Sequence, residues 1–267
     1  MITHRPQSSE PRRSTGISIE VSYSPLRKCA AWGVHLFTAL GAVAGLMALV
    51  ATTAHEWRAA LLWMGATILV DSLDGTLARA VKVKLVLPRF DGALLDNIVD
   101  YFTYVIVPAY FLYEAPVVPG RFAIFAGAAI TLASAYQFCQ ADAKTADHFF
   151  RGFPSYWNVV VFYLFMLEWP DWLNFTLVLL LALSVFVPVK YLYPSRTRTL
   201  RPLTWLLSGV WIFIVGWIVL HYEETSRSRS FSMLLYLSFG YILYYVVLSL
   251  YLNFRHAGPA DEDNPDE

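Results

Sequence analysis

The sequence predicts an all-α integral membrane protein with about eight transmembrane helices. Three observations lead to this fold class. Of the 267 residues, 57% are hydrophobic, only 15% carry a charge, and the apolar residues gather in long runs. Soluble domains carry roughly 25% charged residues, and about 20 apolar residues are enough to cross a bilayer. Because acidic and basic residues are equal in number, nothing in the overall charge points to a nucleic-acid partner.

Eight apolar runs are candidate membrane spans, and the fifth is the shortest. They are residues 30–54, 57–81, 92–113, 121–140, 156–168, 173–193, 203–222 and 231–254. Short polar joints, such as residues 53–56, 116–120 and 168–171, separate them as in antiparallel helix hairpins. We expect residues 1–28 to be a cytoplasmic tail, residues 29–255 the transmembrane catalytic domain, and residues 256–267 an acidic cytoplasmic tail.

The basic residues of the joints predict the orientation. Lys82, Lys84 and Arg89 follow the second span on the side of the N-terminus, whereas Arg58 and Arg121 are among the few on the opposite side. Loops rich in Lys and Arg stay in the cytoplasm. With an even number of spans, this bias predicts that both termini lie in the cytoplasm.

Four aspartates stand within two predicted spans, where charged side chains are costly and usually functional. Asp71 and Asp74 are three residues apart, and Asp96 and Asp100 are four apart, so each pair shares a helix face. An antiparallel hairpin brings both faces to one pocket near the cytoplasmic surface. Because close carboxylates repel one another, the pocket predicts divalent cations, and all-oxygen ligands favour Mg²⁺, Mn²⁺ or Ca²⁺ over zinc.

Small residues and an arginine accompany the aspartates. Gly75, Ala78 and Gly92 leave room for a ligand to lie against the backbone. Arg79 is one turn from the expected metal ligands and suits a phosphate group. Two metal ions a few ångströms apart neutralise a pyrophosphate and stabilise its leaving group. This combination predicts phosphoryl transfer.

The pattern Asp-x2-Asp-Gly-x2-Ala-Arg…Gly-x3-Asp-x3-Asp, which runs from Asp71 to Asp100, resembles the signature of the CDP-alcohol phosphatidyltransferases, and every fixed position is present. The spacer between Arg79 and Gly92 is longer than is usual in that family. In this respect, and in its eight predicted spans, the chain is similar to the bacterial phosphatidylcholine synthase branch. The resemblance implies a six-helix core, two Mn²⁺ or Mg²⁺ ions, a possible homodimer, and a bacterial inner-membrane enzyme whose active site faces the cytoplasm.

The resemblance also implies roles for single residues. The implied metal ligands are Asp71, Asp74, Asp96 and, as a further ligand, Asp100. The implied contacts of CDP-diacylglycerol are Gly75, Ala78, Arg79 and Gly92. Asp100 is the implied general base, which takes the proton of the acceptor hydroxyl before CMP leaves.

The acceptor alcohol implied by the branch is choline, while serine, inositol and glycerol 3-phosphate are acceptors of enzymes with the same motif. Aromatic faces and carboxylates recognise a quaternary ammonium group. Tyr101 and Tyr104 follow Asp100 within about one turn, and either a choline contact or ordinary packing accounts for them. Thr38 and His35 of the first span lie either beside the nucleotide or in packing contacts.

Other interpretations stay open at this point. An ion-coupled transporter also carries membrane carboxylates, although no matching motif appears in the second half of the chain. Asp91 suits a helix N-cap, and Gly41 and Gly45 suit close helix packing. The basic residues Arg196, Arg198 and Arg201 either steer an anionic lipid or only fix the orientation.

Overall fold

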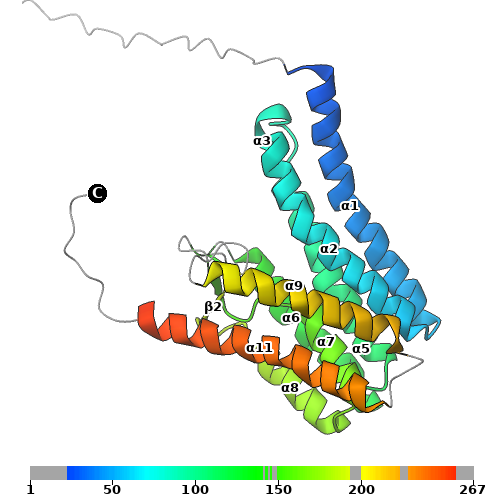
Figure 1. Ribbon diagram of the computed structural model, residues 1–267. Helices are drawn as coiled ribbons and strands as arrows, with labels where there is room; N and C mark the ends of the chain where they lie inside the picture. Colours follow the sequence, from blue (N-terminus) through cyan, green and yellow to red (C-terminus); the bar gives the residue numbers. More distant parts are fainter. Residues whose placement is uncertain are drawn as a thin grey trace, which may run out of the picture.

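The structure is a computed structural model that describes residues 23–140, 142–143, 145, 149–192, 200–222 and 228–256. Helices make up almost all of it (Figure 1). The longer helices are α1 Pro25–Thr53, α2 Trp57–Val81, α6 Gly120–Cys139, α9 Arg201–Leu220 and α11 Arg229–His256. The shorter elements are α3 Val83–Val86, α4 Gly92–Tyr101, η1 Phe102–Ile106, α5 Val107–Glu114, α7 Trp157–Met166, α8 Asp171–Ser184, β1 Phe149–Arg151 and β2 Lys190–Leu192.

Helices α1 and α2 form an antiparallel hairpin, packed along most of its length. Small residues such as Ala44 and Ala48 build much of the buried face of α1. A β-carbon at Gly45 would lie 2.7 Å from the Phe102 ring, and one at Gly41 would lie 3.0 Å from the side chain of Val99. The two glycines therefore let α4 and η1 approach α1 closely, which confirms the predicted packing role.

The third predicted span is an unbroken helix over residues 92–114, in which the π-helical turn η1 joins α4 to α5. In η1 the N–H of Val107 bonds to the carbonyl of Phe102, five residues back. A π turn holds more residues than an α turn and is frequent at functional sites. It shifts the side chains of α5 around the helix axis relative to those of α4.

Helix α8 ends at Ser184, so the predicted sixth span, residues 173–193, is wrong over residues 185–192, and residue 193 lies outside the described residues. Pro188 has no N–H to donate to the Ser184 carbonyl, so an α-helix through this stretch would lose a hydrogen bond. The chain instead runs into β2, which pairs antiparallel with β1. Gly152 follows β1 directly and has a φ of +77°. A β-carbon at this residue would lie 2.1 Å from the Val185 carbonyl oxygen. Only glycine fits that position.

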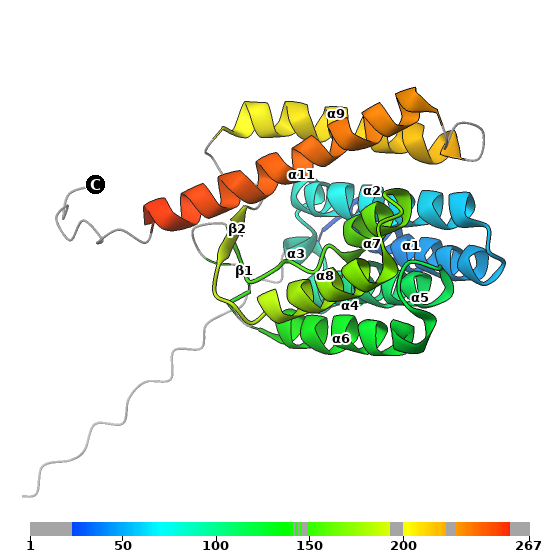
Figure 2. The ribbon, with the colours of Figure 1, turned by 90° about the horizontal axis from the view of Figure 1, so that it is seen from below.

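Helices α9 and α11 form a pair along one side of the molecule, with α6 on the opposite side (Figure 2). Helix α9 packs on α2, and α11 packs on α9 and on β2. Three side chains near the end of α11 bond to the backbone of β2. The Lys190 N–H donates to Asn253 Oδ1 at 3.1 Å, the Leu192 N–H donates to Ser249 Oγ at 2.9 Å, and Tyr245 donates to the Leu192 carbonyl at 3.0 Å.

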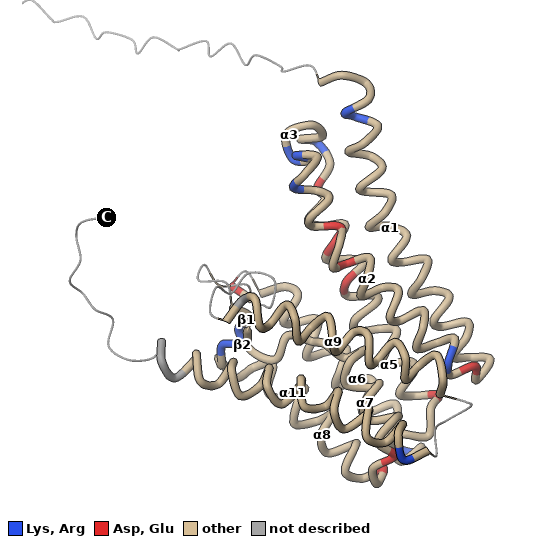
Figure 3. The backbone as a smooth tube through the Cα atoms, in the orientation of Figure 1, with Lys and Arg blue, Asp and Glu red and all other residues tan. Residues whose placement is uncertain are grey.

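The chain is an all-α integral membrane protein. Of the described helices, α1, α2, α6, α9 and α11 are five that are long and apolar enough to cross a bilayer. Their outer faces carry exposed large apolar side chains, such as Leu36, Leu40 and Val43 on α1, as expected of a surface that meets lipid. Basic residues gather around α3, while acidic residues follow the adjoining part of α2 (Figure 3).

Candidate active site

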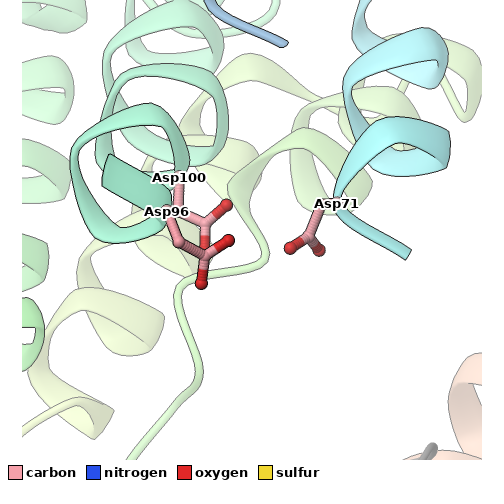
Figure 4. Close-up of side chains that lie close together, drawn as sticks. All are labelled: Asp71, Asp96 and Asp100. Carbon is pink, nitrogen blue, oxygen red and sulfur yellow. The ribbon is translucent and has the colours of Figure 1, made fainter. Parts of the chain in front are cut away.

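Asp71, Asp96 and Asp100 point toward one another from two helices (Figure 4). Asp71 comes from α2, and the other two come from α4. One carboxylate oxygen of each lies within 4.8 Å of the others, and all three side chains are half-buried. Three carboxylates at this separation offer only oxygen ligands, which suit a hard divalent cation. The arrangement therefore fits a divalent metal ion.

A single stripe of side chains on α4 and η1 faces the same space. Ala93, Asp96, Asp100 and Tyr104 recur every three or four residues and line one cavity. The Tyr104 hydroxyl donates a hydrogen bond to Asp71 Oδ2 at 2.8 Å. This bond ties η1 to α2 and fixes the Tyr104 ring beside the carboxylates.

Asp74 faces α1 and is not part of the three-carboxylate group. Thr38 Oγ1 on α1 donates to Asp74 Oδ2 at 2.9 Å, and both residues are buried. Thr38, predicted to lie beside the nucleotide or in packing contacts, therefore supports a motif aspartate. The role of Asp74 as a metal ligand stays a prediction.

Arg79 lies along the surface of α2 over Gly75. Its Nη2 donates to Thr76 Oγ1 at 3.0 Å, and its Nη1 would lie 3.3 Å from a β-carbon at Gly75. Glycine at this position leaves room for the guanidinium one turn from Asp71. Ala78 is partly buried against the small cluster of Ala31, Val34, Val83 and Val86.

The space beside Gly92 is filled by a side chain of α1. A β-carbon at Gly92 would lie 2.5 Å from His35 Cε1. His35 is buried and packs on Phe90 with ring centroids 4.3 Å apart, and its Nε2 has no hydrogen-bond partner among the described residues. Asp91 accepts hydrogen bonds from the N–H groups of Ala93 and Leu94 at 3.1 and 3.0 Å. Its predicted role as an N-cap is confirmed.

The cavity in front of the aspartates has a volume of about 530 Å³, within the usual size of a small-molecule site. Its far wall comes from the end of α6 and from the segment between α6 and α7, where no sequence motif pointed to a site. The wall residues that were missed are Gln137, Phe138, Gln140, Phe150 and Tyr156. The available signal was the gathering of Phe and Tyr in residues 149–156, inside an otherwise polar joint.

Tyr101 does not line this cavity. Its hydroxyl donates to the Thr131 carbonyl at 3.1 Å, and its ring packs edge-on against Phe138. Of the two tyrosines considered for choline, Tyr104 faces the cavity and Tyr101 holds α4 against α6. In the predicted basic loop, Arg196 and Arg198 lie outside the described residues.

Comparison with known proteins identifies relatives over most of the chain, although no protein-family model matches it. A phosphatidylcholine synthase of Legionella pneumophila is 44% identical over 229 residues, which are 83% of this chain and 88% of the relative. A phosphatidylcholine synthase of Pseudomonas aeruginosa is 38% identical over 237 residues, 89% of this chain and 98% of the relative. A phosphatidylcholine synthase of Borreliella burgdorferi is 34% identical over 225 residues, which are 84% of this chain and 95% of the relative.

Proposed function

The chain belongs to the phosphatidylcholine synthase family, and we propose that it transfers the phosphatidyl group of CDP-diacylglycerol to choline with release of CMP. The observation that carries the proposal is the meeting of Asp71, Asp96 and Asp100 at one cavity. Carboxylates from two helices of a membrane protein are costly to bring together, and bound divalent metal ions would offset that cost.

Two divalent ions, Mn²⁺ or Mg²⁺, belong to this proposal. Asp71, Asp96 and Asp100 would hold them, together with Asp74 from the next turn of α2. When bound, the ions neutralise the pyrophosphate and stabilise the leaving phosphate of CMP. The all-oxygen ligand set of the three clustered carboxylates supports this choice of metal.

Arg79, Gly75, Ala78 and Gly92 are the proposed contacts of CDP-diacylglycerol. Arg79 extends over Gly75 on the helix that carries Asp71. A pyrophosphate beside the aspartates can therefore accept hydrogen bonds from the Arg79 guanidinium. Such charge-assisted hydrogen bonds are stronger than those between neutral groups. The His35 ring beside Gly92 restricts the nucleotide to the space that the imidazole leaves.

Asp100 is the proposed general base. It lines the cavity one turn beyond Asp96, beside Tyr104. It takes the proton of the acceptor hydroxyl, and the acceptor oxygen forms a bond to the phosphorus that bears diacylglycerol. The bond between that phosphorus and the bridging oxygen breaks, and CMP leaves with the electron pair. General base catalysis of this kind contributes typically a factor of about 10²–10⁴ in rate.

The proposal places the site at the cytoplasmic face of the bacterial inner membrane. Lys82, Lys84 and Arg89 lie in and beside α3, which connects α2 to α4, and basic residues of this kind stay inside the cell. The aspartates lie in the parts of α2 and α4 that adjoin this connection. The opposite end carries the exposed His55 and the partly buried Glu114, 3.7 Å apart.

A transfer assay on the purified protein tests the function. CDP-diacylglycerol and Mn²⁺ or Mg²⁺ are supplied with labelled choline, serine, inositol or glycerol 3-phosphate in separate reactions. We expect labelled phosphatidylcholine and an equal amount of CMP, with choline alone. Product from a different alcohol would correct the acceptor and keep the reaction. No product from any of the four would overturn the proposal and return attention to ion transport.

A further inference from the structure

One wall of the cavity is aromatic and is built from three parts of the fold. Tyr104 comes from η1, Phe150 from β1, and Tyr156 from the residue before α7. The Tyr156 ring lies 6.3 Å from that of Tyr104 and 6.0 Å from that of Phe150. The three rings therefore form a continuous surface that borders the same space as Asp96 and Asp100.

The chemistry of this space suits an organic cation. Among the described residues that line the cavity there is no Lys or Arg, and three are aspartates. Arg151, which follows Phe150 in β1, forms an ion pair with Asp142. The amide oxygen of Gln140 is buried in the wall without a hydrogen-bond partner among the described residues, which adds a partial negative charge. Aromatic faces attract a quaternary ammonium group within about 6 Å of the ring centroid.

We propose that Tyr104, Phe150 and Tyr156 form the subsite for the trimethylammonium group of the acceptor alcohol and direct its hydroxyl toward Asp100. This assignment rests on the proposed function and makes the three rings the selectivity determinants of the site. An ammonium group with N–H bonds gains less from such a wall, since it is strongly hydrated and seeks hydrogen-bond acceptors. An anionic acceptor finds no Lys or Arg in the described lining to pair with.

The surroundings hold each ring in place. Tyr104 is fixed by its hydrogen bond to Asp71. The neighbours of Tyr156 are both anchored on α6: Ser155 Oγ donates to Gln137 Oε1 at 2.6 Å, and Trp157 Nε1 donates to Ser134 Oγ at 2.8 Å.

Phe150 is held through the small sheet. Its strand partner is Tyr191 of β2, and the side chains of Asn253, Ser249 and Tyr245 on α11 bond to the β2 backbone on either side of that residue. The Tyr245 ring also lies 6.4 Å from that of Tyr156. The C-terminal helix thus positions the aromatic wall, although its residues are remote from the aspartates in sequence.

The test compares Phe150→Leu with Phe149→Leu. Phe150 lines the cavity, whereas its neighbour Phe149 is buried with Leu192, Leu248 and Leu252 on the other side of the strand. We expect Phe150→Leu and Tyr156→Leu to raise the KM for choline about three- to thirty-fold, the range of a lost cation–π contact. The KM for CDP-diacylglycerol stays within about twofold. Phe150→Tyr, which keeps an aromatic face, retains the choline KM, and Phe149→Leu leaves the ratio of the two KM values unchanged.

A binding measurement separates this proposal from the proposed reaction. Saturation-transfer NMR on the N-methyl protons of choline reports weak binding to the purified wild-type protein without any turnover. We expect a signal that tetramethylammonium suppresses, and its loss in Phe150→Leu but not in Phe149→Leu. If wild type binds choline in this way and makes no phosphatidylcholine, the reaction is wrong and the subsite stands. If wild type gives no signal, or if both Leu variants of the wall keep the wild-type choline KM, the subsite is overturned.

Discussion

Replacing Thr38 by valine removes the hydroxyl that bonds to Asp74 and, with it, a longer contact of 3.4 Å to the Val34 carbonyl of the same helix. Valine has nearly the shape of threonine but cannot donate. The Thr38 hydroxyl donates to Asp74 Oδ2 at 2.9 Å in a buried contact between α1 and α2. A hydrogen bond to a charged group contributes about 1.5–3 kcal/mol, and a partner left buried without its donor costs a similar amount. A free-energy difference of about 1.36 kcal/mol corresponds to a factor of ten in rate. Losing this bond is therefore expected to lower the kcat/KM for CDP-diacylglycerol roughly ten- to hundred-fold.

The assay is the kcat/KM for CDP-diacylglycerol at saturating choline, together with the metal concentration that gives half-maximal activity. We expect Thr38→Val to lower the first by roughly ten- to hundred-fold and to raise the second. Thr52→Val is the matched control. Thr52 is also buried on α1, but its hydroxyl donates at 2.7 Å to the Ala48 carbonyl of its own helix. That carbonyl keeps its helical backbone hydrogen bond when the hydroxyl is removed. We expect that variant to stay within about twofold of wild type.

A wild-type kcat/KM and metal response in Thr38→Val would contradict this role of the Thr38 hydroxyl. That result would show that other groups hold Asp74 in its working position. Equal losses in Thr38→Val and Thr52→Val would show instead that α1 had been damaged as a whole, which the thermal transitions of both variants would register.

Further expected outcomes concern the carboxylates and the packing of α1. Asp100→Asn should abolish transfer while calorimetry still detects CDP-diacylglycerol binding, and full activity in this variant would remove Asp100 from the role of base. Asp96→Asn should lose the metal response and nucleotide binding together. Chelation should stop the wild-type reaction and added Mn²⁺ should restore it, so activity that survives thorough chelation would contradict the metal proposal. Gly45→Ala places a β-carbon 2.7 Å from Phe102, whereas one at Gly33 meets nothing within 4 Å. We therefore expect a Tm lower by roughly 3–10 °C for Gly45→Ala alone, and equal transitions for Gly45→Ala and Gly33→Ala would contradict the close approach.

Hydropathy predicted the long helices well because length and apolar character are local properties. The first two spans agree with α1 and α2 to within a few residues at most ends. The error after Ser184 has a different origin. Residues 185–193 are apolar enough to continue a span, but Pro188 disfavours a helix, and β2 finds its hydrogen bonds in β1 and α11. Such long-range partners are invisible in a single sequence.

The motif predicted the meeting of Asp71, Asp96 and Asp100, since helical spacing and the short connection between the two helices decide it. It could not predict that Asp74 bonds to Thr38, because that contact depends on the rotation of α2 against α1. The same holds for Tyr101, which helical spacing places near the catalytic stripe but whose hydroxyl bonds to α6. Nothing in the spacing of Phe150 or Tyr156 indicated that a loop and a strand would bring them to the aspartates.

The buried face of α1 has a thermodynamic consequence. Ala44, Ala48, Gly41 and Gly45 surrender no side-chain rotamer freedom when they are packed, whereas a buried leucine loses about 0.5–1 kcal/mol of it. In a lipid environment the hydrophobic effect contributes little to the contact between helices, so dispersion must drive their association. A helix face of alanine and glycine makes close dispersion contacts with the least loss of side-chain entropy. The helix carrying Thr38 can therefore stay ordered while substrates enter and leave beside it.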